Sequence, residues 1–174
     1  MKRINILYLC LLFVYLAVAG VALYFSFQSV EFIEEKAKIV GGLLALSSVP
    51  HLILFGLRGG FKSNKNVPFA MLGVIGVTVG AAFMLTKEID LAMLNTFCLI
   101  WGIFDIVRSS YELTELIPEV QEKKWLELIE VFISVGEIVI AILLIMDRFE
   151  GIKLHFLYLG ISFVAYFVKF LIQK

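Results

Sequence analysis

The chain has 174 residues, of which 61% are hydrophobic and only 17% are charged, and its formal net charge is zero. A soluble domain of this size needs far more polar surface, so the composition excludes an ordinary soluble globular protein and predicts an integral membrane protein. The absence of net positive charge also removes the electrostatic basis for nucleic-acid binding.

Apolar runs of about 20 residues recur along the chain, and each is long enough to cross a hydrocarbon core of ~30 Å. Together they predict an all-α, polytopic membrane protein with a single transmembrane domain over residues 1–174. The six predicted transmembrane helices, paired as three helical hairpins, lie at about residues 4–27, 37–57, 67–86, 91–112, 125–146 and 152–172. The longest link, 113–124, fits either a solvated turn or a segment along the membrane interface, because its apolar residues recur at helical spacing.

The first segment also fits a secretory signal, because Met1-Lys2-Arg3 precedes an apolar run that reaches Ala17-Val18-Ala19. The apolar run continues past Ala19 to Phe25, as a spanning helix requires. We therefore expect this segment to stay in the protein as its first transmembrane helix.

The second and third segments contain residues that shape helix packing. Pro50 is expected to kink the second helix and to free a backbone carbonyl next to His51. In the third segment, Gly76-x-x-x-Gly80 preceded by Gly73 places small residues on one face and allows another helix to approach closely. Packing within the chain is favoured over dimerisation through this face.

Lysine and arginine residues predict the orientation in the membrane. With the N-terminus inside, the inner side carries ten of the 15 Lys and Arg residues and the outer side carries five. The positive-inside tendency therefore favours both termini in the cytoplasm and a location in the cytoplasmic (inner) membrane of a bacterium or archaeon.

An internal repeat is predicted from three similar stretches, 18–22, 78–82 and 134–138, whose central residues are Gly20, Gly80 and Gly136. The glycines are about 60 residues apart, and each segment is followed by a short link and a second helix. This pattern predicts three successive helical hairpins that stack into one bundle, since one hairpin is too small to bury its own faces.

The stretch 97–108, FCLIWGIFDIVR, resembles the end of an even-numbered helix in the HdeD-like (acid-resistance membrane protein) family. Trp125 at the start of the fifth segment and Gly136-x-x-x-x-Ala141 are similar to that family's odd-numbered helices. The resemblance covers most of the chain at the level of pattern. It implies a six-helix membrane protein that acts in envelope stress without a defined reaction, and no catalytic residue transfers with it.

Neither the histidines nor the cysteines indicate a chemical site. His51 is expected inside the membrane and His155 near the solvated outer edge, which disfavours a shared metal site. Cys10 and Cys98 fall inside apolar runs and are expected to be small buried hydrophobes. Because the sequence has no hydrolase, metalloprotease, P-loop or dinucleotide motif, a non-enzymatic protein without metal or cofactor is expected.

The fourth and fifth segments carry ionisable residues inside apolar runs, where charge is expensive and usually functional. Asp105 and Arg108 share one helical stripe. At a rise of ~1.5 Å per residue, Arg108 and Glu130 are expected at the same depth from the inner edge. The three side chains are predicted to form an ion-paired network, because the arginine fork can serve two carboxylates.

Glu137 is expected near the midplane of the bilayer, beyond the reach of any lysine or arginine. A carboxyl group buried without a cation favours its neutral form, so Glu137 is predicted to be protonated at rest. His51 is expected at the depth of Asp105, either as a hydrogen-bonded helix residue or as part of a proton path. The polar residues as a group are either a structural network or such a path.

Two functions are compatible with these patterns. The first is a non-enzymatic membrane protein of the HdeD-like kind, which acts in the envelope stress response or as a partner of another membrane protein. The second is a small proton-coupled transporter or channel that uses Asp105, Glu130, Glu137 and His51. The expected partners are the lipid bilayer and either a second copy of the chain or another membrane protein, and nucleic acid is not among them.

Overall fold

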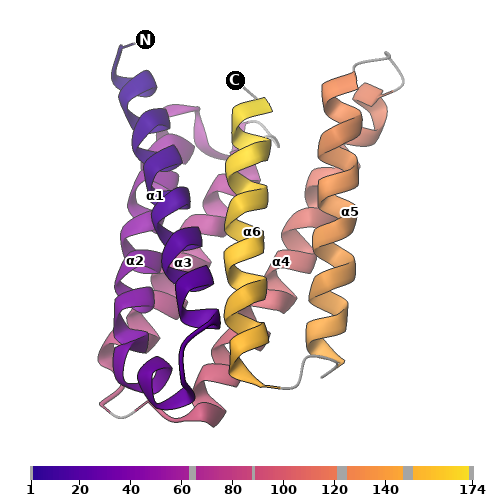
Figure 1. Cartoon of the computed structure of the whole chain (residues 1–174). Coiled ribbons are helices and arrows are strands. Elements are labelled where there is room, and N and C mark those ends of the chain that lie inside the picture. The colour runs from indigo at the N-terminus through magenta and orange to yellow at the C-terminus, as the bar shows by residue number, and fades with distance from the viewer. Residues whose placement is uncertain (1, 63–65, 88, 121–124, 147–150, 173–174) are drawn as a thin grey trace.

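The computed structural model describes residues 2–62, 66–87, 89–120, 125–146 and 151–172 (Figure 1). Their elements, in chain order, are α1 (Lys2–Ser26), α2 (Val30–Leu57), the short 3-10 helix η1 (Gly60–Lys62), α3 (Val67–Leu85), α4 (Leu91–Val120), α5 (Trp125–Ile145) and α6 (Ile152–Ile172). All six α-helices contain a stretch long and apolar enough to cross a membrane. The predicted all-α polytopic bundle is therefore confirmed.

Two helices extend beyond their predicted ends. Helix α2 begins at Val30, seven residues before the predicted start, because the acidic link is helical. The hydroxyl of Ser29 caps this helix by accepting the backbone N–H of Phe32 at 3.3 Å, and Glu31 lies in the first turn, where the helix dipole favours a negative charge. Helix α4 continues to Val120, so the described part of the longest link is helical, and residues 121–124 lie outside the described residues.

The helices form two layers of three, with α1, α6 and α5 in front of α2, α3 and α4 in the view of Figure 1. The described chain begins and ends at the same end of the bundle, as an even number of crossings requires. The most extensive contacts join α2 with α3, α1 with α6, and α4 with α5. The predicted hairpins pair α1 with α2, α3 with α4 and α5 with α6; these helices are also neighbours, but they share less surface.

Glycines let α2 and α3 approach closely. A Cβ atom built on Gly80 would lie 2.6 Å from the backbone nitrogen of Ala45, and one on Gly76 would lie 3.0 Å from the carbonyl oxygen of Leu44. Gly73 of α3 faces the side chain of Leu52, which lies on α2 like Ala45 and Leu44. These three glycines therefore pack within the chain, against α2.

The glycines that define the predicted repeat have different surroundings. A Cβ atom on Gly20 or Gly136 would meet no atom within 4 Å, apart from its own helix backbone and chain neighbours, whereas Gly80 lies against backbone. The three positions therefore do not share a packing role, and the internal repeat stays a prediction from sequence.

Adding one methyl group should thus affect the free energy of unfolding differently at two of these positions. We expect Gly80→Ala to lower the free energy of unfolding by about 1–3 kcal/mol, because the new Cβ overlaps backbone that must shift. Gly136→Ala should leave it unchanged or raise it by up to ~1 kcal/mol, because alanine favours helix and has space there. Denaturation in mixed detergent micelles measures both, and equal effects at the two positions would contradict the close packing of α2 and α3.

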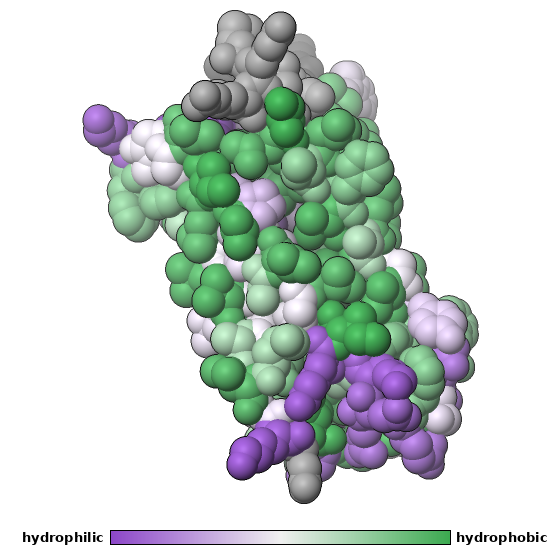
Figure 2. Space-filling model, turned by 90° about the vertical axis from the view of Figure 1, so that its left-hand side faces the viewer, coloured by the Kyte–Doolittle hydropathy of each residue, from purple (hydrophilic) through white to green (hydrophobic). Residues whose placement is uncertain are grey.

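The outer surface of the bundle is apolar between its ends. Figure 2 shows a broad hydrophobic band, with hydrophilic residues gathered mainly towards the ends of the molecule. Large apolar side chains such as Phe13 (66% exposed) and Phe132 (70% exposed) point outward. Such a surface suits lipid, and several ionisable side chains of the spanning helices are buried inside the bundle instead, among them Asp105, Arg108, Glu137 and Lys169.

Candidate functional site: a charged cluster inside the bundle

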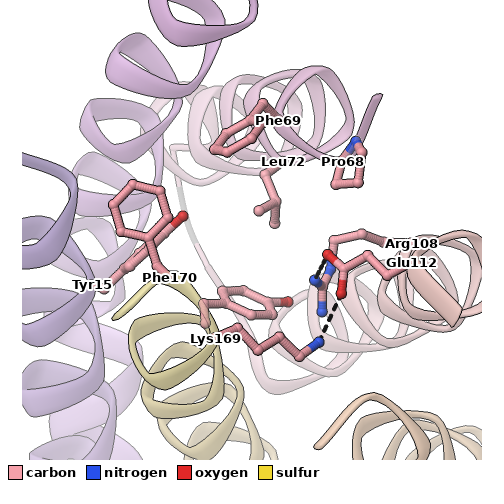
Figure 3. Close-up of a pocket in the computed structure, with 9 residues that line it drawn as sticks. Tyr15, Pro68, Phe69, Leu72, Arg108, Glu112, Lys169 and Phe170 are labelled. Carbon is pink, nitrogen blue, oxygen red and sulfur yellow. Dashed lines mark hydrogen bonds and ion pairs between the residues drawn. The ribbon is translucent and has the colours of Figure 1, made fainter. Parts of the chain in front are cut away.

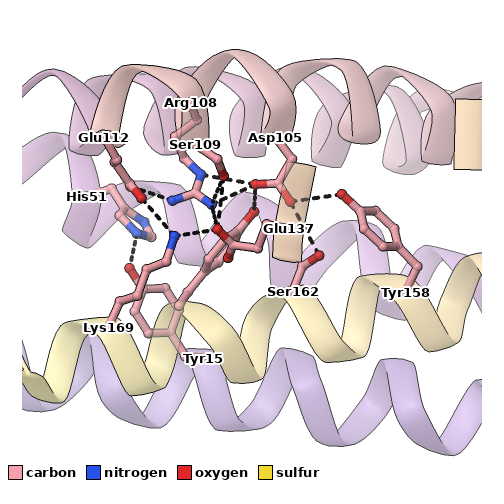
Figure 4. A network of polar contacts seen from close by, with 11 residues as sticks. Tyr15, His51, Asp105, Arg108, Ser109, Glu112, Glu137, Tyr158, Ser162 and Lys169 are labelled. Atoms are coloured by element: carbon pink, nitrogen blue, oxygen red, sulfur yellow. Dashed lines mark hydrogen bonds and ion pairs between the residues drawn. The ribbon is translucent and has the colours of Figure 1, made fainter. Parts of the chain in front are cut away.

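Five ionisable side chains meet inside the bundle, and we refer to them as the charged cluster. They are Asp105, Arg108 and Glu112 of α4, Glu137 of α5 and Lys169 of α6 (Figure 4). Four of them are at least 95% buried, and the Glu112 side chain is 12% exposed. Charged groups inside a spanning bundle are costly unless they pair, so their meeting from three helices makes this the candidate functional site.

Arg108 is the centre of the cluster. Its Nη2 donates to Asp105 Oδ1 at 2.7 Å and to Glu137 Oε2 at 2.9 Å, and its Nη1 donates to Glu112 Oε1 at 2.5 Å. The guanidinium carbon also lies 4.2 Å from the ring centroid of Tyr166, where a cation is attracted to the aromatic face. One arginine therefore links three carboxyl groups, which its several donors allow.

Asp105 accepts hydrogen bonds at both of its oxygens. Oδ1 accepts from Arg108 and, at 2.6 Å, from the Tyr166 hydroxyl. Oδ2 accepts from the Tyr158 hydroxyl at 2.8 Å and from Ser162 at 3.4 Å. A carboxyl group surrounded entirely by donors is held in its ionised form.

Glu137 has one crowded oxygen and one free oxygen. Oε2 accepts from Arg108, from Ser109 Oγ at 2.9 Å and from Lys169 Nζ. Oε1 is buried and has no hydrogen-bond partner among the described residues. The expectation that no cation reaches Glu137 is therefore wrong, because both Arg108 and Lys169 contact it.

Helix length explains why Glu137, and not Glu130, contacts Arg108. The prediction ended the fourth helix at residue 112, but α4 continues to Val120, twelve residues past Arg108. Glu137 lies twelve residues after the start of α5 at Trp125. Both side chains are thus about 18 Å from the ends of two antiparallel neighbours, at the same level.

Glu130 lies two turns from Glu137 on the same buried face of α5. It is not among the carboxylates that pair with Arg108 in the described part of the chain. The predicted Asp105–Arg108 pair is present, and Glu137 occupies the position that the sequence assigned to Glu130.

His51 lies beside the cluster and is fully hydrogen-bonded. Its Nδ1 lies 2.5 Å from the carbonyl oxygen of Ser47, which can only accept, so Nδ1 carries a proton. Its Nε2 lies 2.6 Å from the Tyr15 hydroxyl, which donates to the neutral ring. The Tyr15 ring in turn packs edge-on against Tyr166 at a centroid distance of 6.1 Å, so Tyr15 connects His51 to the edge of the cluster.

A pocket of about 60 Å³ adjoins the charged cluster. One wall is apolar and comes mainly from α3 and the end of α6, whereas the other wall carries charge from α4 and α6 (Figure 3). The residues that line it are Tyr15, Pro68, Phe69, Leu72, Arg108, Glu112, Tyr166, Lys169 and Phe170. A space of this size holds several water molecules, so Glu112, Arg108 and Lys169 can meet a small polar species there.

Other candidate residues make no second site. Cys10 is exposed on the outside of α1 rather than buried as expected, Cys98 is buried, and neither forms a disulfide. His155 is buried and not solvated as expected. In the described ranges, no group of three or more His, Cys, Asp or Glu side chains is arranged to hold a metal ion.

Helix α6 contributes to the charged cluster, which was not predicted from the sequence. Lys169 of this helix is buried and pairs with Glu112 at 2.8 Å and with Glu137. Polar residues recur at helical spacing along this helix and were the available signal; they are Tyr158, Ser162, Tyr166 and Lys169. A polar stripe in an apolar helix must face the bundle interior, and α6 does so.

Comparison with models of known protein families, with curated proteins and with solved structures finds no match to this chain.

Proposed function

We propose that this multi-pass membrane protein is a small, non-enzymatic proton-coupled transporter in which Glu137 binds and releases the proton. The observation that carries the proposal is the free oxygen of Glu137. Every other carboxyl oxygen of the charged cluster accepts a hydrogen bond, whereas Glu137 Oε1 has no partner among the described residues.

The charges of the cluster support the same role. It contains three acids, Asp105, Glu112 and Glu137, and two bases, Arg108 and Lys169. A buried group carrying net charge is costly in a low-dielectric medium, so one bound proton makes the cluster neutral. Of the three acids, Glu137 has the oxygen on which that proton meets no competing donor.

The groups around Glu137 come from several helices. They are Asp105, Arg108, Ser109 and Glu112 of α4, and Tyr166 and Lys169 of α6, with Tyr15 of α1 and His51 of α2 farther away. The pocket lined by Glu112 adjoins the cluster, and we infer that protons exchange between the cluster and water through it.

The orientation follows from charge. We place both termini in the cytoplasm of a bacterial or archaeal cell, with the protein in its cytoplasmic membrane. Omitting the buried Arg108 and Lys169 from the inner count still leaves eight Lys and Arg residues inside against five outside. The pocket, which Pro68 at the start of α3 and Phe170 near the end of α6 help to line, then lies in the cytoplasmic half.

Proton flux into proteoliposomes under an imposed pH gradient tests the proposal. The wild-type protein should conduct protons above the rate of empty liposomes, and Glu137→Gln should reduce the flux to that background, because the amide cannot carry the proton. Glu35→Gln is the matched control, since Glu35 is exposed at the start of α2, far from the cluster in sequence, and its loss should leave the flux unchanged.

Wild-type flux equal to that of empty liposomes, or equal flux in wild type and Glu137→Gln, would contradict the proposal. The charged cluster would then be a structural network, and the second candidate would apply. This is a non-enzymatic role in envelope stress or as a partner of itself or another membrane protein, which the resemblance to the HdeD-like family implies. It is supported by the small extent of the chain outside the six apolar helices.

A further inference from the structure

Glu112 occupies a position that suits a ligand. Its carboxylate bridges two cations, with Oε1 at 2.5 Å from Arg108 Nη1 and Oε2 at 2.8 Å from Lys169 Nζ. All three side chains line the pocket, and Glu112 is the most exposed of them, at 12% of its side chain. A carboxylate from outside that enters the pocket would find both cations within reach, once Glu112 turns away.

We propose that the pocket binds a small monocarboxylate, which displaces Glu112 from Arg108 and Lys169 while Glu112 takes up one proton. This inference rests on the proposed function, in which a proton on Glu137 makes the resting cluster neutral, and it adds a second proton, on Glu112, and the class of substrate. The proton and the anion arrive together, so the buried charge of the cluster does not change.

The charge of the pocket selects an anion. Arg108 and Lys169 face it with two positive charges, and Glu112 faces it with one negative charge. An organic cation would be repelled once Glu112 is neutral, and a dianion would need a second proton. Arg58, which is exposed, lies with its guanidinium 5.0 Å from the ring centroid of Phe69 on the pocket wall and adds attraction for anions near the pocket.

The apolar wall selects a short hydrocarbon tail. Phe69, Leu72 and Phe170 lie opposite the charged side chains (Figure 3). A volume of about 60 Å³ accommodates about four to six atoms of the size of water at roughly 10–15 Å³ each. That range corresponds to acetate through butyrate, and longer chains need more space than the pocket offers.

The groups that face Glu112 determine its response to pH. They are Asp105 and Arg108 of α4, Glu137 of α5, Tyr166 and Lys169 of α6 and Tyr15 of α1, whereas α3 contributes only apolar side chains. Both cations favour the ionised form of Glu112 while they contact it, so the proton is taken up only when the substrate carboxylate replaces it.

Calorimetric titration of the full chain in lipid nanodiscs tests this inference, with butyrate as the probe. Butyrate should bind with uptake of about one proton, counted from the dependence of the heat on the buffer's ionisation enthalpy. Empty nanodiscs give the background, and butyramide and butylammonium, which have four carbon atoms like butyrate but no negative charge, should not bind. Lys169→Met should weaken butyrate binding about tenfold to a hundredfold, because one charged donor is lost.

Leu72→Ala keeps the test valid if Lys169→Met does not fold. Shortening this apolar side chain enlarges the pocket, so the preferred chain length should shift from butyrate towards hexanoate, a gain that general damage to the structure cannot produce. Butyrate binding without proton uptake, or equal binding of butyramide, would overturn the displacement of Glu112. Absence of butyrate binding together with Glu137-dependent proton flux would overturn the carboxylate pocket alone, whereas absence of that flux would overturn the proposed function as well.

Discussion

Arg108→Met is expected to lower the free energy of unfolding by about 3–5 kcal/mol, a large part of the stability of a protein of this size. The reason is the number of groups that depend on one guanidinium. Asp105, Glu112 and Glu137 all accept hydrogen bonds from it, and its removal leaves three buried acids with one remaining cation, Lys169. The cluster is then neutral only with two bound protons, one more than in the wild type, or it must admit water into the bundle, and both are costly.

Two comparisons isolate this effect in the same detergent denaturation measurement. Arg58→Met removes an exposed arginine whose main contacts are with the Tyr8 and Phe69 rings, and it should cost no more than ~1 kcal/mol. Arg108→Met combined with Glu137→Gln removes one base and one acid, and it should recover part of the stability that the single variant loses. A loss for Arg108→Met no larger than that for Arg58→Met would contradict the central role of Arg108.

The number of helices could be predicted because a membrane imposes one length on every apolar segment. The ends of the helices could not be predicted, because hydropathy indicates where a segment leaves the membrane and not where its helix ends. Residues 113–120 contain charged side chains, and hydropathy therefore placed them in a link, although they continue α4. This error of eight residues shifted the predicted partner of Arg108 from Glu137 to Glu130.

The ionisable residues of the site were recognisable in part. Asp105 and Arg108 are three residues apart on one helix, so their contact follows from helix geometry alone. Lys169 reaches Glu112 and Glu137 from α6, and chain order does not determine that α6 packs against α4. Contacts between distant segments depend on how the whole bundle packs, which no local pattern encodes.

The prediction for Glu137 was correct in part and wrong in part. Its depth and burial were anticipated, but two cations contact it. A proton on Glu137 can therefore not be inferred from a lack of nearby positive charge. We infer this proton from the excess of one acid over the bases in the cluster and from the Oε1 atom, which has no hydrogen-bond partner among the described residues. Only the three-dimensional arrangement reveals both features.

Asp105→Leu should be comparably destabilising, by about 3–5 kcal/mol, for a different reason. Asp105 is the acceptor for Arg108 and for the hydroxyl groups of Tyr158 and Tyr166, and leucine accepts from none of them. Each buried donor left without an acceptor costs roughly 1–3 kcal/mol, more when it is charged. Denaturation in detergent measures the loss in the free energy of unfolding. Tyr158→Phe is the comparison, because it removes a single donor and should lower the free energy of unfolding by only about 1 kcal/mol.

A combined variant separates the unpaired donors from the lost side-chain volume. If unpaired hydroxyl groups cause much of the loss, then Asp105→Leu together with Tyr158→Phe and Tyr166→Phe removes the groups that were left unpaired and should be more stable than Asp105→Leu alone. If the losses in stability of the three substitutions simply add, then the tyrosine hydroxyl groups do not depend on Asp105, and its carboxylate stabilises the protein only by pairing with Arg108. Recovery in the combined variant would instead identify Asp105 as the fixed anion that ties α6 to α4, on which the positions of Lys169 and Tyr166 beside Glu137 depend.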